Sequence, residues 1–149
     1  MSLILHELVH FFVSLLIAFF VIKKYKSLKF AIIVMVVGMF LDIDHIFDII
    51  LASGNFKEII TGHYFATSQK AYVLLHSWEL LIPWWGYICW KTSHHSSGSK
   101  NNLYPLGWAV TLAFVGHLLI DQFSYNTHLF TYFISYKIFV NFDLSKLFG

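Results

Sequence analysis

Long apolar stretches restrict most strongly what this chain can fold into. Residues 3–22 form one mostly apolar run, and about 20 such residues are needed to cross a bilayer. Further runs cover residues 30–52 and 71–90, and a fourth begins at residue 107. Apolar residues make up 58% of the 149-residue chain and charged residues only 12%, which indicates a membrane protein. We therefore expect a single all-α domain over residues 1–149, an integral membrane bundle of about four transmembrane helices.

The fourth run is interrupted by the polar stretch SYNTH at residues 124–128. The apolar piece that follows, residues 129–140, is too short to cross a bilayer, so it predicts a short C-terminal interfacial helix. The predicted polar connections between the spans are residues 23–29, 53–70 and 91–106.

The basic residues predict the orientation of the bundle. All ten are lysines, and the connection at residues 23–29 holds Lys23, Lys24, Lys26 and Lys29. The positive-inside rule then places this connection, and the one at residues 91–106, on the cytoplasmic side of a multi-pass protein of the cytoplasmic (inner) membrane. Because the basic residues are few and do not cluster on a soluble face, we expect membrane lipids as partners and no nucleic acid.

Acidic residues and histidines lie together inside the apolar runs. Six of the eight acidic residues fall there, although a charge at the centre of a membrane helix costs about 2.5–3.5 kcal/mol. Each cluster has helical spacing, so its members share one helix face. Because successive spans alternate in direction, all four clusters should reach one membrane face, the extracytoplasmic one. The clusters are His6/His10 with Glu7, Asp42/Asp44/His45 with Asp48, His76/Glu79 and His117/Asp121.

Converging imidazoles and carboxylates in an apolar bundle predict a metal site, because a divalent cation offsets the carboxylate charges. The candidates exceed the four ligands of a tetrahedral zinc, so we expect one or two divalent metal ions, zinc first, with manganese or iron as alternatives. Asp42 and Asp44 lie about 200° apart on an ideal helix, so they cannot both bind the metal. One of them should instead orient a ligand histidine through a hydrogen bond. The predicted metal ligands are His6, Asp42, Asp44, His45, His76, His117 and Asp121.

Three of these segments carry a family resemblance. GMFLDIDHIFD (38–48), LLHSWE (74–79) and GHLLIDQ (116–122) resemble the membrane-bound metal-dependent hydrolases known as LexA-binding inner-membrane hydrolases. That family has an early His, then G-x-x-x-P-D-x-D-H, T-H-S and G-x-x-x-H-x-x-x-D. The corresponding residues here are His6, Asp42, Asp44, His45, His76, Ser77, His117 and Asp121.

The chain departs from this pattern at several positions. Leu41 replaces the family's proline, Leu75 replaces its threonine, and Ala71 and Tyr72 stand in place of a His-Arg pair. The arginine that the resemblance implies for holding an anionic substrate is therefore missing. The H-x-x-x-D element and helical site are also similar to those of zinc-dependent phospholipase C and P1-type nucleases, which suggests phosphoester chemistry by analogy.

HELVH at residues 6–10 matches H-E-x-x-H, the helix signature of zinc metalloproteases. An intramembrane zinc metalloprotease is therefore an alternative, with Glu7 as general base. Site-2-type proteases take their third ligand from an L-D-G motif, often preceded by Asn-Pro. This chain has LDID (41–44) without the glycine and contains no Asn-Pro.

We therefore expect a metal-dependent hydrolase acting on a phosphoester or lipid-linked ester of an amphiphilic substrate at the bilayer surface. Glu79 or Glu7 is the predicted general base. A metal-free ion- or proton-coupled transporter is the alternative from another class, and a metalloprotein without catalytic activity that acts as an assembly partner is a third. A transporter needs a polar path through the whole bundle, whereas residues 17–22 and 30–37 are apolar.

Overall fold

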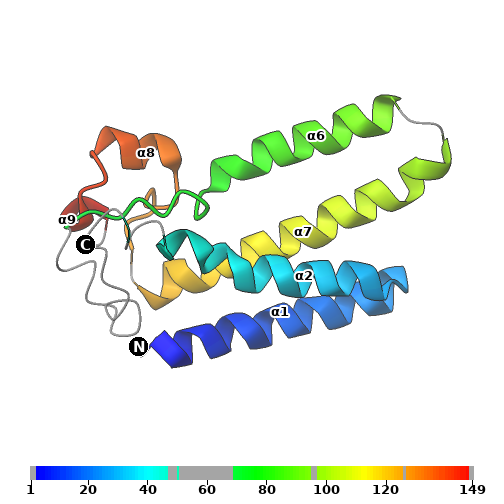
Figure 1. Ribbon diagram of the computed structural model, residues 1–149, viewed down its shortest axis with the longest axis horizontal. Helices are drawn as coiled ribbons and strands as arrows, with labels where there is room; N and C mark the ends of the chain where they lie inside the picture. The colour runs from blue at the N-terminus through cyan, green and yellow to red at the C-terminus, as the bar shows by residue number, and fades with distance from the viewer. Residues whose placement is uncertain (1–2, 47–49, 51–68, 95–96, 126, 148–149) are drawn as a thin grey trace.

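The computed structural model describes residues 3–46, 50, 69–94, 97–125 and 127–147. These residues form an all-α structure without a named strand, and four longer helices run along the molecule (Figure 1). The longer helices are α1 (Leu3–Tyr25), α2 (Leu28–Phe40), α6 (Leu81–His94) and α7 (Ser97–Ser124). The short elements are the 3-10 helices η1 (Leu41–Ile43) and η2 (Trp78–Leu80) and the helices α8 (Ile134–Phe139) and α9 (Leu144–Leu147).

The first apolar run forms α1, as predicted, and a tight turn then reverses the chain. Lys26 has a φ of 53°, in the left-handed region, and Ser27 caps α2 by accepting a hydrogen bond from the Phe30 amide. Because only residues 26–27 separate the two helices, α1 and α2 are antiparallel neighbours. The lysine-rich turn lies at the opposite end of the bundle from the chain's N-terminus (Figure 1).

Small residues bring α1, α2 and α7 close together. The buried core between them contains Ala18, Ala31, Ala109 and Ala113. A Cβ atom on Gly38 would lie 2.1 Å from Ser14 Oγ, so any other residue here would displace the Ser14 side chain at this approach of α2 to α1. Packing of small side chains is the usual way for apolar helices to associate in a bilayer.

The outward faces of these helices are apolar. On α1 the side chains of Phe12 and Phe19 are 61% and 58% exposed, and Leu28 on α2 is 67% exposed. A helix of a water-soluble bundle presents polar residues on this face. The segments Leu5–Tyr25 and Leu103–Ser124 are long and apolar enough to cross a membrane. Both observations support a membrane protein.

The second and third predicted spans differ from the structure. After α2 ends at Phe40, the chain continues as η1 and a short helical turn to residue 46, and most of the rest of the predicted span, including Asp48, lies outside the described residues. Residues 71–77 are not helical, and α6 begins only at Leu81. Tertiary hydrogen bonds replace the helical ones there, as with the Leu75 amide, which donates to Asp44.

The predicted polar connection at residues 91–106 is also largely helical, since α6 continues to His94 and α7 begins at Ser97. The end of α7 at Ser124 agrees with the predicted break at the polar stretch that starts there.

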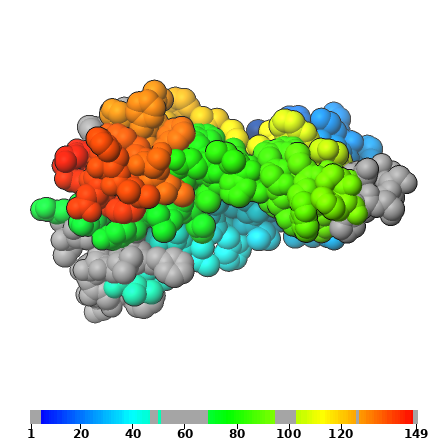
Figure 2. All heavy atoms as spheres, turned by 90° about the horizontal axis from the view of Figure 1, so that it is seen from above, coloured from blue at the N-terminus to red at the C-terminus, as the bar shows by residue number. Residues whose placement is uncertain are grey.

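The predicted C-terminal helix is shorter than residues 129–140 and belongs to a cap. Turns at residues 129–132 precede α8, and α9 follows it. The cap is fixed to the extended segment 69–77 by backbone hydrogen bonds, including Ala71 N to Phe142 O at 3.0 Å and Leu144 N to Gln69 O at 2.9 Å. Figure 2 shows the orange-to-red cap against the green segment that precedes α6. The cap lies at the end of the bundle where α1 begins and α7 ends (Figure 1).

Candidate metal centre

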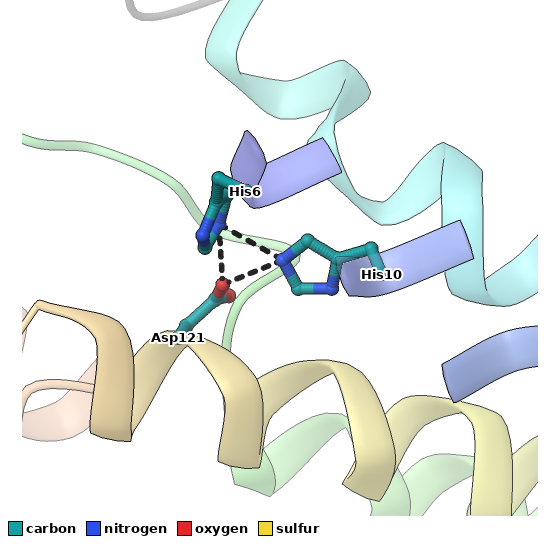
Figure 3. Close-up of side chains that lie close together, drawn as sticks. All are labelled: His6, His10 and Asp121. Carbon is teal, nitrogen blue, oxygen red and sulfur yellow. Dashed lines mark hydrogen bonds and ion pairs between the residues drawn. The ribbon is translucent and has the colours of Figure 1, made fainter. Parts of the chain in front are cut away.

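Two histidines of α1 and one aspartate of α7 form a first group of ligand atoms. His6 and His10 are one helical turn apart, so both rings face α7. Their Nε2 atoms lie 2.9 Å from each other and 3.0 Å each from Asp121 Oδ1 (Figure 3). All three side chains are buried.

A second group surrounds the other oxygen of the same aspartate. The Nε2 atoms of His76 and His117 are 3.0 Å apart and lie 3.3 and 3.4 Å from Asp121 Oδ2. Asp42 Oδ1 approaches these two nitrogens to 3.1 and 3.4 Å. Asp121 therefore directs one oxygen to each group.

The far nitrogen of each ring in the second group has an acceptor that fixes its tautomer. His117 Nδ1 lies 2.9 Å from the carbonyl oxygen of Gly38, which can only accept, so Nδ1 carries the hydrogen. His76 Nδ1 lies 3.1 Å from Asp44 Oδ2 in the same way. In neutral rings both Nε2 atoms then present lone pairs to each other, and a cation between them relieves that repulsion.

The spacing of the donor atoms fits a divalent metal. Four ligands at about 2.0–2.1 Å from a tetrahedral zinc lie about 3.3 Å from one another, and within each group the distances run from 2.9 to 3.4 Å. Asp121 Oδ2 is buried and makes no hydrogen bond. Such an orphaned carboxylate oxygen among imidazole nitrogens is satisfied by a metal ion. The buried His and Asp groups can therefore hold a metal ion.

The structure places five of the seven predicted ligands in these two groups: His6, Asp42, His76, His117 and Asp121. His45, whose side chain is 30% exposed, has Nε2 3.5 Å from Asp42 Oδ1 and forms a further possible ligand set with Asp42 and His76. Asp44 belongs to neither group. It accepts a hydrogen bond from His76 Nδ1, the ring nitrogen that faces away from the group, as expected for one of the two aspartates.

His10 was not among the predicted ligands, although the structure places its Nε2 atom in the first group, close to both His6 and Asp121. Its signal in the sequence is the i,i+4 spacing from His6.

The two predicted general bases lie outside both groups. Glu79 accepts hydrogen bonds from the backbone amides of Ile134 and Ser135, so both carboxylate oxygens contact the first turn of α8. Burial opposes ionisation of Glu79, but these hydrogen bonds outweigh it and hold its pKa below the usual value. Glu7 is exposed on α1, next to His6.

A fully buried lysine, which the sequence analysis left without a role, supports the segment that carries His76. Lys137 Nζ, on α8, donates to the carbonyl oxygens of Val73 at 2.6 Å and His76 at 2.8 Å. It also lies 3.3 Å from Ser77 Oγ. Its signal in the sequence is a lone charge in the otherwise uncharged segment ISYKIF. The ammonium group thus fixes the backbone on both sides of a candidate ligand.

The fold and the site together define an apolar, all-helical protein with a buried histidine–carboxylate centre suited to metal ions. Comparisons with models of known protein families, with curated proteins and with solved structures find no match to this chain. The resemblance noted above therefore rests on the motif residues alone.

Proposed function

We propose that this chain is a multi-pass membrane protein and a metal-dependent hydrolase with a two-metal centre. Its substrate is an amphiphilic phosphoester or lipid-linked ester at the bilayer surface. The observation that carries the proposal is the position of Asp121, whose two oxygens face two histidine pairs. The pairs adjoin where the His10 and His117 rings stack, with ring centroids 3.9 Å apart. Carboxylates that connect two metal ions are common in enzymes that cleave phosphoesters.

His6, His10 and Asp121 would hold one ion, and Asp42, His76, His117 and Asp121 the other. Zinc is the first candidate, with manganese or iron as alternatives, because all three accept mixed imidazole and carboxylate ligands. Such ions activate water as a nucleophile near neutral pH and polarise the bond to be cleaved. The residues of the chain orient this centre: Asp44 and the Gly38 carbonyl fix the ring planes of His76 and His117.

The distribution of charge supports an orientation in the cytoplasmic (inner) membrane. The buried centre lies at one end of the bundle, and the turn that contains Lys26 lies at the other (Figure 1). The positive-inside rule then assigns the centre to the extracytoplasmic side, at the depth of the lipid headgroups. In the four-span arrangement proposed here, α2 and α6 have 13 and 14 residues and are shorter than a full span of about 20, so they require a locally thinner bilayer.

One observation favours the protease alternative. His6, His10 and Asp121 form a three-ligand set of the kind that an H-E-x-x-H zinc site needs, with the aspartate supplied by another helix. A single-zinc protease gives no role to the second group around His76 and His117, so we favour the hydrolase.

Activity measurements on metal-loaded protein in lipid nanodiscs distinguish these functions. The substrates are bis(p-nitrophenyl) phosphate, a p-nitrophenyl acyl ester and a quenched fluorescent peptide. We expect hydrolysis of an ester substrate that is lost in Asp42→Asn and retained in Asp143→Asn, a change of an acidic residue outside the centre. Peptide cleavage that is lost in Glu7→Gln and retained in Asp42→Asn would establish the protease instead. A metal-free protein that carries protons across the bilayer would establish the transporter.

A further inference from the structure

A pocket of about 220 Å³ adjoins the candidate metal centre. The buried polar residues that line it are His76 and Asp121, which we call its polar end, and its apolar walls include Val73, Tyr132 and Leu144. The walls therefore come from the extended segment before α6 and from the C-terminal cap. One end of the pocket is polar and suited to a metal, and the walls are largely apolar.

The pocket has no fixed cation that would hold a free anionic ligand. None of the described residues that line it is a lysine or an arginine. The neighbouring Lys137 is directed at the carbonyl oxygens of Val73 and His76 and is fully buried. An occupant must therefore be apolar along the walls and polar only at the end formed by His76 and Asp121.

Three of the lining residues are not buried, His45, Tyr125 and Leu144, and they mark where the pocket opens. Tyr125 is 44% exposed, and apolar side chains close to it in sequence are exposed as well. Phe123 is 82% exposed and Leu129 is 70% exposed. A molecule that lies in the membrane interface therefore meets exposed apolar side chains in the part of the chain that holds Tyr125.

We infer that this pocket binds the hydrocarbon chain of a single-chain amphiphile, with the polar head of that molecule at His76 and Asp121. This inference rests on the proposed hydrolase centre and adds the substrate class. Pockets for drug-sized ligands have volumes of about 300–1,000 Å³. The smaller pocket here has room for one hydrocarbon chain and is too small for two such chains side by side.

Alkyl hydroxamates test the inference, because their head binds metal ions and their chain length can be varied. Acetohydroxamate and octanohydroxamate are titrated into zinc-loaded protein in nanodiscs. We expect octanohydroxamate to bind at least about 10-fold more tightly, since its longer chain leaves water when it enters the apolar pocket. Leu144→Trp and, as a second variant, Val73→Phe should remove this gain without weakening acetohydroxamate binding. Ile138→Trp, at an exposed position of α8, should keep the gain.

The outcomes separate the pocket from the metal centre. The inference is wrong if acetohydroxamate binds the wild type and octanohydroxamate binds it no more tightly. It is also wrong if octanohydroxamate still binds more tightly in both Leu144→Trp and Val73→Phe, because the pocket is then not the chain-binding site. If zinc is not retained and neither hydroxamate binds, both the proposed hydrolase centre and the inference are wrong.

Discussion

Lys137 on α8 donates a hydrogen bond of 2.8 Å to the backbone carbonyl oxygen of His76, a candidate ligand 61 positions earlier in the chain. The same ammonium group is bonded to the carbonyl oxygen of Val73. The C-terminal cap therefore fixes the geometry of the candidate centre through main-chain contacts. This coupling explains why an isolated charge is buried completely in an apolar protein.

Replacement of Lys137 by methionine should destabilise the protein and weaken metal binding together. The change removes the ammonium donor from the His76 carbonyl oxygen and one of the donors to the Val73 carbonyl oxygen, which the His76 amide also contacts. A buried polar group left unsatisfied costs about 1–3 kcal/mol. Thermal unfolding and zinc titration in detergent measure both effects. Lys146→Met is the matched control, because the Lys146 side chain is 61% exposed, and it should change neither quantity measurably. Equal behaviour of the two variants would contradict the proposed role of Lys137.

Asp44→Asn should reduce metal affinity while leaving the metal stoichiometry unchanged. Asp44 accepts hydrogen bonds from His76 Nδ1 and from the Leu75 amide, and it is outside both ligand groups. Loss of a carboxylate that supports a ligand histidine typically costs about 10–100-fold in metal affinity. Competition with a chromophoric chelator gives the affinity. Complete loss of one metal equivalent would instead make Asp44 a direct ligand.

Gly38→Ala should destabilise the bundle and disturb His117. The added methyl group would meet Ser14 Oγ at 2.1 Å, and the Gly38 carbonyl oxygen orients the His117 ring. Overpacking of this kind costs about 1–3 kcal/mol. Gly86→Ala on α6 is the control: a Cβ atom there has no neighbour within 4 Å, and helix propensity predicts a gain of about 0.5–1 kcal/mol. Unfolding in a denaturing detergent gives the change in the free energy of unfolding for each variant. A change of the same sign in both variants would contradict the close approach of α1 and α2.

The stability contribution of Glu79 should depend on pH in the acidic range. Hydrogen bonds from α8 lower the pKa of Glu79 in the folded protein below its usual value of 4.5, although burial opposes this shift. The ionised carboxylate therefore stabilises the fold fully above the unfolded pKa, and this contribution is lost as the pH falls through the folded pKa. In metal-free protein, the stability difference between wild type and Glu79→Gln should shrink as the pH is lowered from 6 to 3. A difference that stays constant would show that the charge of Glu79 has no role in fixing α8.

Much of the centre could be predicted from residue spacing, because the relevant residues lie on helices. The pairs His6/His10 and His117/Asp121 are one turn apart, so each shares a helix face wherever the helix packs. Helix directions that alternate along the chain then bring the clusters to one end of the molecule (Figure 1).

The segment around His76 could not be predicted in the same way. Its apolar composition favours a helix that begins near Ala71, but α6 begins only at Leu81. Long-range contacts from Asp44 and Lys137 satisfy its backbone instead, and no local pattern encodes them. The role of Glu79 was obscured for the same reason, since its partners lie 55 and 56 residues away on α8.

Metal content by elemental mass spectrometry tests the central claim most directly. The protein is purified in detergent without chelators and compared with Asp121→Ala, His6→Ala and, as a control outside the centre, Asp143→Ala. The account predicts two equivalents of zinc, manganese or iron in the wild type and the control, one in His6→Ala and none in Asp121→Ala. A wild-type protein without bound metal, or an Asp121→Ala variant that retains its full complement, would contradict it.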